Sequence, residues 1–282
     1  MATNGRSQKS APRLNQQLSQ PRVAEMVADI LRTRIVDGEL ADGELLPKQD
    51  DLLEEFPVSR PSIREAMRIL ETEGLISVRR GNIGGAEVHA PTAHGAAFML
   101  GMVMQSKQLT LNDLGQALRI LEPACAALCA GRSDRHTEVV PRLREVNKEA
   151  ETHLDNGPEF TDLARVFHDE MVGSCGNVTL ILLVGTLETL WSYHESRWAV
   201  TTDAEGRYPG LKLREAVLEA HVRITDAIDS GDEDAAHRVS QRHIEEAQAY
   251  VLNNTGNQRV NITGLRSRLA PRRSRGPDGD LS

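Results

Sequence analysis

Aromatic residues and cysteines are scarce in this 282-residue chain, and long apolar runs are missing. Aromatics make up 3% of the residues, which argues against a surface that stacks the bases of RNA or single-stranded DNA. No apolar run approaches the roughly 20 residues that cross a bilayer, and the first twenty residues lack the apolar core of a secretory signal. We therefore expect a cytoplasmic protein with no membrane partner.

The three cysteines do not indicate a disulfide framework, because their number is odd and the expected compartment is reducing. Cys125 and Cys129 lie four residues apart in an Ala-rich helical stretch. Two readings stay open for this pair: buried thiols, which the apolar surroundings favour, and metal ligands.

A net charge of −8 disfavours a protein that coats nucleic acid, but the charges are unevenly distributed. Residues 58–82 hold five arginines against three glutamates, while acids gather just before them, at residues 50–55. This pattern fits a binder that makes few phosphate contacts per subunit and gains affinity by dimerising.

Residues 58–72 have the spacing of an amphipathic helix. Arg60, Arg64 and Arg68 follow one another every four residues, while Ser59 suits the N-cap and Pro61 the first turn. The apolar positions recur on the opposite side, at Ile63, Ala66, Met67 and Leu70. Taken alone, a helix with three arginines is more often a solvated face than a DNA-binding surface.

The flanking segments change that balance. Residues 46–56 predict a short preceding helix, and residues 74–89 predict two β-prone runs around a Gly- and Asn-rich turn. Helix, turn, basic helix and hairpin form a winged helix-turn-helix, whose second helix can enter the DNA major groove. A further helix is predicted from Pro21 to Gly38, with one apolar stripe facing the basic helix: Val23, Met26, Val27, Ile30 and Ile35.

From about residue 109 every informative segment has a helical pattern, without strand alternation or fixed repeats, which predicts an all-α bundle. The expected fold is thus mainly α, with a small β-wing near the N-terminus. The expected domains are a disordered tail (1–20), a DNA-binding domain (21–92), a linker helix (93–108), an all-α ligand-binding domain (109–254) and an Arg-rich disordered tail (255–282). That last tail is either a solubilising segment or an electrostatic arm for DNA.

Three histidines, His168, His221 and His243, lie on apolar helix stripes. A single histidine in such a place is usually a hydrogen-bonded core residue. Three of them on three helices of one bundle can instead meet and hold a divalent metal such as zinc. Two functions then remain open for the bundle, a regulatory ligand site and a three-histidine metalloenzyme. No general base or lid-like glycine-rich loop supports the enzyme.

With both halves considered, the chain resembles a GntR-family transcription regulator of the FadR subfamily, with an all-helical FCD effector domain. The resemblance rests on residues 38–47 (GELADGELLP), 58–81 (VSRPSIREAMRILETEGLISVRRG) and 118–130 (LRILEPACAALCA), and on the histidines, with Asn177 following His168. It spans roughly residues 21 to 252, and it implies a homodimer that binds a palindromic operator in double-stranded DNA under control of a small-molecule effector.

The resemblance also implies site residues. Those that meet DNA would be Ser59, Arg60, Pro61, Ser62, Arg64 and Arg68 on the basic helix, with Arg80 and Gly81 at the wing tip. One departure is Asp50, where the family usually has an arginine; its carboxylate would repel phosphate or turn to a cytosine.

In the FCD domain the family's metal ligands are an aspartate and three histidines. His168, His221 and His243 match, but Ala164 stands in the aspartate position, and Asp162 points elsewhere on the helix. A second departure is Leu118, where many relatives carry an arginine for an anionic effector; Arg119 is its neighbour. We predict a weak or three-histidine metal site, with an empty site as the alternative, and we predict Arg119 as an effector contact and a repressor. The two departures disfavour a simple carboxylate effector bound in the family's usual way and leave a more apolar ligand open. A non-specific DNA-packaging protein is a third reading, which the net acidity disfavours.

Overall fold

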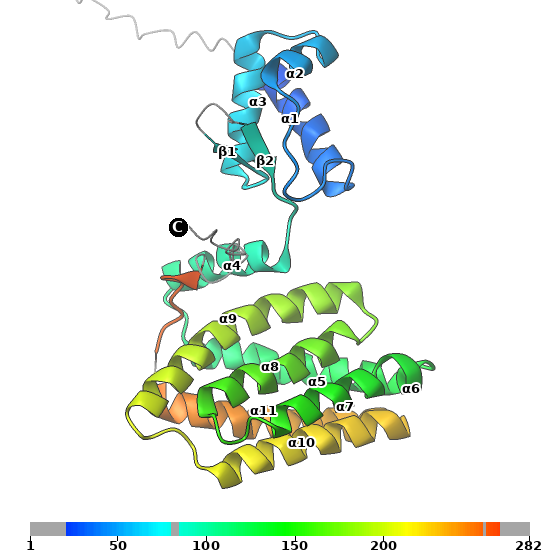
Figure 1. Ribbon diagram of the computed structural model, residues 1–282, viewed down its shortest axis with the longest axis vertical. Coiled ribbons are helices and arrows are strands. Elements are labelled where there is room, and N and C mark those ends of the chain that lie inside the picture. The colour runs from blue at the N-terminus through cyan, green and yellow to red at the C-terminus, as the bar shows by residue number, and fades with distance from the viewer. Residues whose placement is uncertain (1–20, 80–84, 256–257, 266–282) are drawn as a thin grey trace, which may run out of the picture. The chain divides into compact units, whose positions relative to one another are not determined.

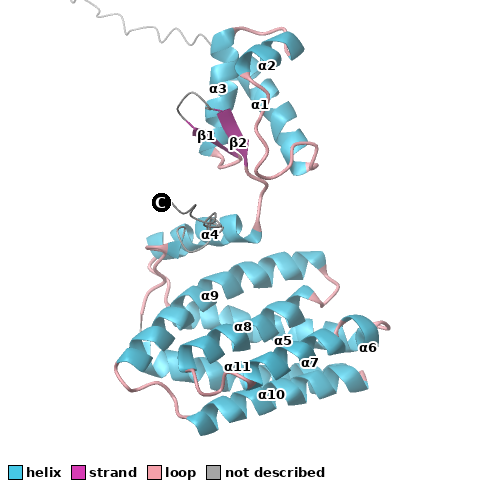
Figure 2. Ribbon diagram, in the orientation of Figure 1, coloured by secondary structure: helices cyan, strands magenta, loops and turns pink. Residues whose placement is uncertain are grey.

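The structure is a computed structural model that describes residues 21–79, 85–255 and 258–265. The chain divides into two compact units, the first ending at Pro91 and the second beginning at Thr92 (Figure 1). Figure 2 shows that helices dominate and that the strands of the described residues lie in the first unit. The expected fold class, mainly α with a small β-wing, is confirmed. Within the same residues no helix is both long and apolar enough for a membrane crossing.

The first unit is a small helical domain with a β-hairpin. In chain order it contains α1 (Pro21–Val36), α2 (Gln49–Glu55), α3 (Arg60–Thr72), β1 (Ile76–Arg79) and β2 (Gly85–Val88). The strands pair antiparallel, with Ile76 opposite Val88. Leu46 donates its backbone N–H to the carbonyl of Ala86 at 2.8 Å, so the segment before α2 covers the free edge of β2.

The buried face of α1 differs from our prediction. Val27 and Ile35 are buried, but Val23, Met26 and Ile30 are each at least 40% exposed. Three other positions complete the buried face that packs on α3: Ala24, Ala28 and Leu31. The predicted stripe was wrong because α1 is apolar around much of its circumference, so periodicity alone does not single out one face. The small alanines allow α1 to pack closely on α3.

The second unit is an all-α bundle. It contains α4 (Ala93–Ser106), α5 (Leu111–Gly131), α6 (Arg135–Glu138), α7 (Val140–Glu151), α8 (Gly157–Gly173), α9 (Val178–Ala204), α10 (Leu211–Ser230) and α11 (Glu233–Thr255). Side-chain caps at Thr110, Asn156 and Asn177 fix the starts of α5, α8 and α9. The segment that we assigned to a linker, α4, packs on α9 in this unit.

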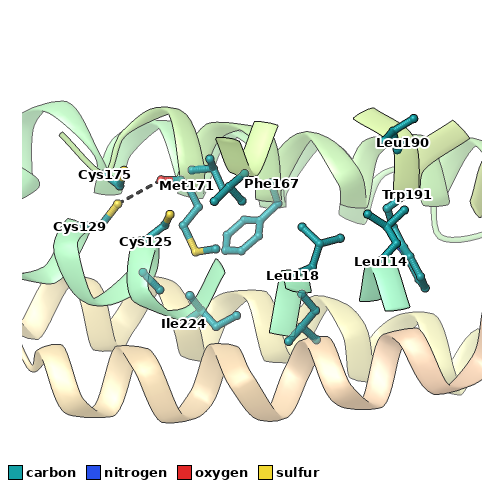
Figure 3. Packing of buried hydrophobic residues seen from close by; sticks show 14 of the residues in the cluster. Leu114, Leu118, Cys125, Cys129, Phe167, Met171, Cys175, Leu190, Trp191 and Ile224 are labelled. Carbon is teal, nitrogen blue, oxygen red and sulfur yellow. Dashed lines mark hydrogen bonds between the residues drawn. The ribbon is translucent and has the colours of Figure 1, made fainter. Parts of the chain in front are cut away.

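The bundle core runs between α5, α8, α9 and α10 (Figure 3). Leu118 of α5 is fully buried there, as are Phe167 and Met171 of α8. Cys125 and Cys129 are buried too, and the Cys129 thiol donates to the backbone carbonyl of Met171 at 3.2 Å. Burial raises the pKa of Cys129 to about 12, so these cysteines are core thiols without thiolate character.

The end of α11 continues into an ordered segment rather than the disordered tail that we expected from residue 255. Val260 donates its N–H to Leu109 at 2.9 Å, and Leu111 donates to Gln258 at the same distance. Val260 and Leu265 are each 1% exposed, because they insert against the bundle. The remaining Arg-rich residues, 266–282, lie outside the described part of the chain.

Candidate functional site

The N-terminal end of α3 is fixed by its own hydroxyls. The Ser59 hydroxyl accepts a hydrogen bond from the Ser62 N–H at 3.4 Å and lies 2.9 Å from the Ser62 hydroxyl. Pro61 occupies the first turn, as predicted for a position with no N–H partner. Ile63 of this helix is fully buried, which turns the opposite side outward.

That outward side carries the three arginines. The Arg60 guanidinium lies 2.9 Å from the Asp50 carboxylate, and the two side chains are 65% and 75% exposed. Arg68 lies 3.4 Å from Glu65 and is also exposed. Arg64 is exposed and has no hydrogen bond or ion pair among the residues that the structure describes. Exposed ion pairs contribute only about 0–1 kcal/mol, so these arginines can exchange a carboxylate for another anion at little cost.

Our predicted wing contacts cannot be placed. Arg80 and Gly81 lie outside the described residues, between β1 and β2. In the described part of the hairpin the last pair before residues 80–84 is Arg79 with Gly85.

The second candidate site is a cavity of about 100 Å³ inside the bundle, lined mainly by α8, α9, α10 and α11. His168, His221 and His243 are among the residues that line it, and one ring nitrogen from each lies within 4.8 Å of the other two. The Nε2 atom of His243 is 3.0 Å from Nε2 of His221 and 3.3 Å from Nε2 of His168. We call these residues the three-histidine cluster.

Glu122 of α5 orients the cluster. Its carboxylate is 1% exposed and accepts a hydrogen bond from Nδ1 of His168, which leaves Nε2 of that ring facing the other two histidines. Burial alone would raise the pKa of Glu122, but the charge and hydrogen bond of His168 outweigh it and lower that pKa to about 2. A carboxylate behind a histidine is the usual support of a metal ligand.

Burial favours the neutral form of the other two histidines. Burial, reinforced by the neighbouring imidazoles, lowers the pKa of His221 well below its usual value and that of His243 to about 3. Neutral imidazole is the form that binds metals. The charge of Glu122 favours the protonated form of His168. A divalent metal at the point that the three Nε2 atoms face would replace the proton on Nε2 of His168 and bind the lone pairs of all three rings. The donor set therefore fits a divalent metal such as zinc.

No carboxylate joins the three-histidine cluster among the described residues. Ala164 lines the cavity in the position where the resemblance places an aspartate. Asp162 instead accepts a hydrogen bond from Ser196 at 2.8 Å. Three nitrogen ligands leave coordination positions open to water or to an oxygen of a ligand.

Arg119 does not line this cavity. Its guanidinium donates to Oε1 of Gln248 at 2.9 Å, and it is Gln248 that reaches the cavity wall. Leu118 is buried in the core and offers no charge. Arg119 thus acts on the cavity only through Gln248.

Several cavity residues escaped the sequence reasoning. Burial and the neighbouring charge of Glu122 raise the pKa of Glu188 well above its usual value. Burial also raises the pKa of Glu195, to about 7. Arg214 of α10 also lines the cavity. One signal was available: Glu122 lies four residues after Leu118 and three before Cys125, on the buried stripe of α5.

Comparisons with known proteins agree with this two-part architecture. A family model described as "Bacterial regulatory proteins, gntR family" matches residues 23–84, and the FCD domain model matches residues 113–246. The HTH-type transcriptional repressor NanR of Escherichia coli strain K12 is 27% identical over 253 residues, covering 87% of this chain and 88% of NanR. NanR of Shigella flexneri gives the same values.

Among solved structures, Streptococcus agalactiae GntR is similar with a TM-score of 0.62 and 26% identity. The match covers 80% of this chain and 99% of that protein. One family match falls in each compact unit, in the chain order that the resemblance predicted. The chain therefore belongs to the GntR family of DNA-binding transcription regulators and carries an FCD domain as its effector unit.

Proposed function

We propose that this regulator is a homodimeric, cytoplasmic repressor that binds a palindromic operator and responds to a small-molecule effector in its FCD cavity. The observation that carries the proposal is the orientation of α3, with Ile63 buried and Arg64 exposed and unpaired among the described residues. The similar NanR proteins are named as repressors, which supports the sign of regulation.

In this proposal α3 enters the major groove from its N-terminal end. Arg60 and Arg64 donate to guanine edges or phosphates, and Arg68 reaches the backbone further along. Ser59 and Ser62 offer hydroxyls, and Pro61 keeps the first turn free of an unsatisfied N–H. The wing residues Arg80 and Gly81 are assigned by resemblance alone, because they lie outside the described residues.

A dimer supplies the second half-site contact. Two-fold symmetry of the protein matches the two-fold symmetry of a palindrome. Val178 and Leu182 lie one turn apart on α9 and are 70% and 54% exposed, an apolar surface suited to a second copy of the FCD domain.

The three-histidine cluster would hold the metal, with Glu122 fixing the ring of His168. When bound, the ion supplies a Lewis-acidic position that an oxygen of the effector can occupy. The effector acts by population shift: it must bind one arrangement of the dimer better than the other, or the DNA affinity stays unchanged. A metalloenzyme is disfavoured because the family consists of regulators.

A mobility-shift assay tests the proposal. The full chain is titrated onto the region upstream of its own gene and onto a shuffled duplex of equal length at physiological salt. We expect the upstream region to bind at least roughly a thousandfold more tightly. Equal affinity for the two duplexes would contradict sequence-specific regulation.

A further inference from the structure

A surface groove between α10 and α11 gathers positive charge. Its volume is about 530 Å³, and three arginines and one acid are among the residues that line it: Arg223, Arg238, Arg242 and Glu246. We call it the arginine groove. Its lining has a single residue, His243, in common with that of the FCD cavity, so the groove lies outside the space proposed for the effector.

The arginines of this groove are weakly held by acids. Nε of Arg242 lies 2.9 Å from the Glu246 carboxylate, and the two side chains are 82% and 58% exposed. The Arg223 guanidinium lies 3.7 Å from Glu219, a loose contact between exposed side chains. Arg238 is exposed and has no hydrogen bond or ion pair among the residues that the structure describes. Exposed pairs of this kind contribute little stability, so the guanidinium groups can take up another anion at little cost.

A second groove of similar size, between α7 and α10, has balanced charges instead. Its volume is about 500 Å³, and three basic residues line it together with three acids: Arg144, Lys148, Arg223, Glu151, Glu219 and Asp226. Arg223 borders both grooves, whereas Arg238 and Arg242 line the arginine groove and not the balanced one. The excess of positive charge therefore comes chiefly from the two arginines of α11.

The spacing of these arginines suits an oxyanion of the phosphate class. Arg238 and Arg242 lie one turn apart on α11, which puts their Cβ atoms about 5–6 Å apart. Arg223 comes from the neighbouring helix α10. A phosphoryl group accepts several charge-assisted hydrogen bonds at once, and the planar guanidinium matches its oxygen geometry better than an ammonium does. A volume of about 530 Å³ is within the usual range of small-molecule sites.

His243 connects the arginine groove to the three-histidine cluster. Its Nε2 atom faces the cluster, 3.0 Å from Nε2 of His221, while its Nδ1 atom has no hydrogen-bond partner in the described part of the chain. Nδ1 of His168, by contrast, donates to Glu122. A metal-bound histidine almost always donates its second ring N–H to an acceptor. Since His243 also lines the groove, an anion there would supply the acceptor that the chain itself does not.

We propose that the arginine groove binds a phosphate-class oxyanion between the arginines of α10 and α11, and that this anion accepts a hydrogen bond from Nδ1 of His243. The anion supports His243 in the way that Glu122 supports His168. Anion and metal therefore raise each other's affinity by the same factor. The anion site does not depend on the proposed DNA binding or on the effector; its coupling to zinc rests on the proposal that the three-histidine cluster holds a metal.

Isothermal titration calorimetry of the full chain, freed of metal by a chelator, tests the anion site directly. Inorganic phosphate, pyrophosphate and ADP are the probes, in chloride buffer of constant ionic strength. We expect saturable binding of one anion per chain, with pyrophosphate bound more tightly than phosphate. A further gain for ADP would indicate a nucleotide as the natural ligand, and no gain would indicate the free anion. The double variant Arg238→Gln, Arg242→Gln should raise the pyrophosphate Kd at least roughly tenfold.

Arg144→Gln is the matched control, because Arg144 is similarly exposed, at 57%, but lines the balanced groove. Its pyrophosphate Kd should change less than roughly twofold. The melting temperatures of the unliganded variants show that each one folds. No saturable binding of any probe, or equal losses in the control and the double variant, would overturn the proposal. A loss of operator affinity in a double variant whose parent binds none of the anions would show that these arginines contact DNA instead.

The coupling to His243 is measured through zinc. Zinc affinity is determined by competition with a chelator, with and without sulfate at constant ionic strength; sulfate replaces phosphate here because phosphate precipitates zinc. We expect sulfate to tighten zinc binding severalfold in the wild type and not in the double variant. Equal zinc affinity with and without sulfate in the wild type would overturn the hydrogen bond to His243.

The mobility shift distinguishes this inference from the proposed function. Anion binding that depends on Arg238 and Arg242, in a chain without sequence preference for DNA, would retain the groove site and overturn the regulator. Sequence-specific DNA binding by a chain that binds none of the three anions would do the opposite.

Discussion

The two candidate sites hold their charges in opposite ways. On α3 the arginines are exposed, and their ion pairs with Asp50 and Glu65 lie in water. In the FCD cavity Glu122, His221 and His243 are buried and His168 is partly buried, so their charges act on one another with little screening by water. A charge in water can change partners at little cost, whereas a buried one is expensive to leave unpaired. The surface therefore suits reversible DNA contact, and the interior suits selective capture of a small ligand.

The largest expected effect is the loss of DNA affinity in Arg64→Ala. If each dimer carries two copies and each contact contributes about 1–3 kcal/mol, the operator Kd should rise roughly 30-fold to 25,000-fold. The melting temperature should hardly change, because Arg64 is exposed and makes no hydrogen bond or ion pair within the described residues. Fluorescence anisotropy and thermal melting measure the two quantities.

Arg68→Ala is the control for that change, because Arg68 is already paired with Glu65. It should weaken binding less than Arg64→Ala. A large drop in melting temperature for Arg64→Ala would break the contrast between the two sites, since it would show that the surface arginines stabilise the fold.

A substitution inside the FCD cavity should instead lower the stability of the protein. Glu122→Gln removes the buried charge that pairs with His168, which should lower the free energy of unfolding by about 2–4 kcal/mol. The affinity for zinc should fall roughly tenfold to a hundredfold. Urea unfolding and competition with a chelator measure these losses. Glu65→Gln, an exposed control, should stay within about 0.5 kcal/mol of the wild type, and equal costs would contradict the burial argument.

The two sites also differ in how much of each could be predicted from the sequence. The α3 site is local: Ser59, Pro61 and the arginines lie within ten residues, so helical periodicity places them on one face. The three-histidine cluster was predictable as apolar stripes, since each histidine carries its own periodic signal. Glu122, Trp198 and Arg214 were not, because their meeting in one cavity depends on how α5, α9 and α10 pack, which no local pattern encodes. The buried face of α1 failed for a related reason, since several of its faces are apolar.

His194, a buried histidine outside the FCD cavity, should make the stability of the fold depend on pH. Burial, helped by Arg197, lowers the pKa of His194 to about 4 from a usual value of 6.5. Between these values the unfolded chain binds the extra proton and the folded chain does not. Stability should therefore fall as the pH drops from about 6.5 to 4, by at most about 3 kcal/mol from this group.

His194→Gln should flatten the pH dependence in that window, although the buried cavity histidines will keep part of it. Urea unfolding at a series of pH values measures the slope. An unchanged slope in the variant would show that His194 does not contribute.

Packing around α4 gives a smaller effect. A Cβ at Gly101 would lie 2.5 Å from Ile262 and 2.9 Å from Leu190, so Gly101→Ala should cost about 1–3 kcal/mol. Gly185→Ala, in the interior of α9 with nothing within 4 Å, should stabilise by about 0.5–1 kcal/mol. Thermal melting compares them. The same sign for both would contradict the close contact between α4, α9 and the 258–265 segment.

The smallest effect is expected at Asp50. Asp50→Ala removes an exposed ion pair with Arg60, so stability should stay within about 0.5 kcal/mol. Operator affinity should rise severalfold, because the acid no longer competes with phosphate for Arg60. Anisotropy at two salt concentrations checks this, and a loss of affinity would show instead that Asp50 holds Arg60 in its binding position.

Protection of guanine N7 from dimethyl sulfate tests most directly whether α3 lies in the major groove, since N7 is exposed only there. Wild type and Arg64→Ala would be compared on the same operator at saturating protein. The account predicts a protected guanine in each half-site that becomes reactive in Arg64→Ala while protection elsewhere persists. An identical protection pattern in the two proteins, or none at all on bound DNA, would contradict it.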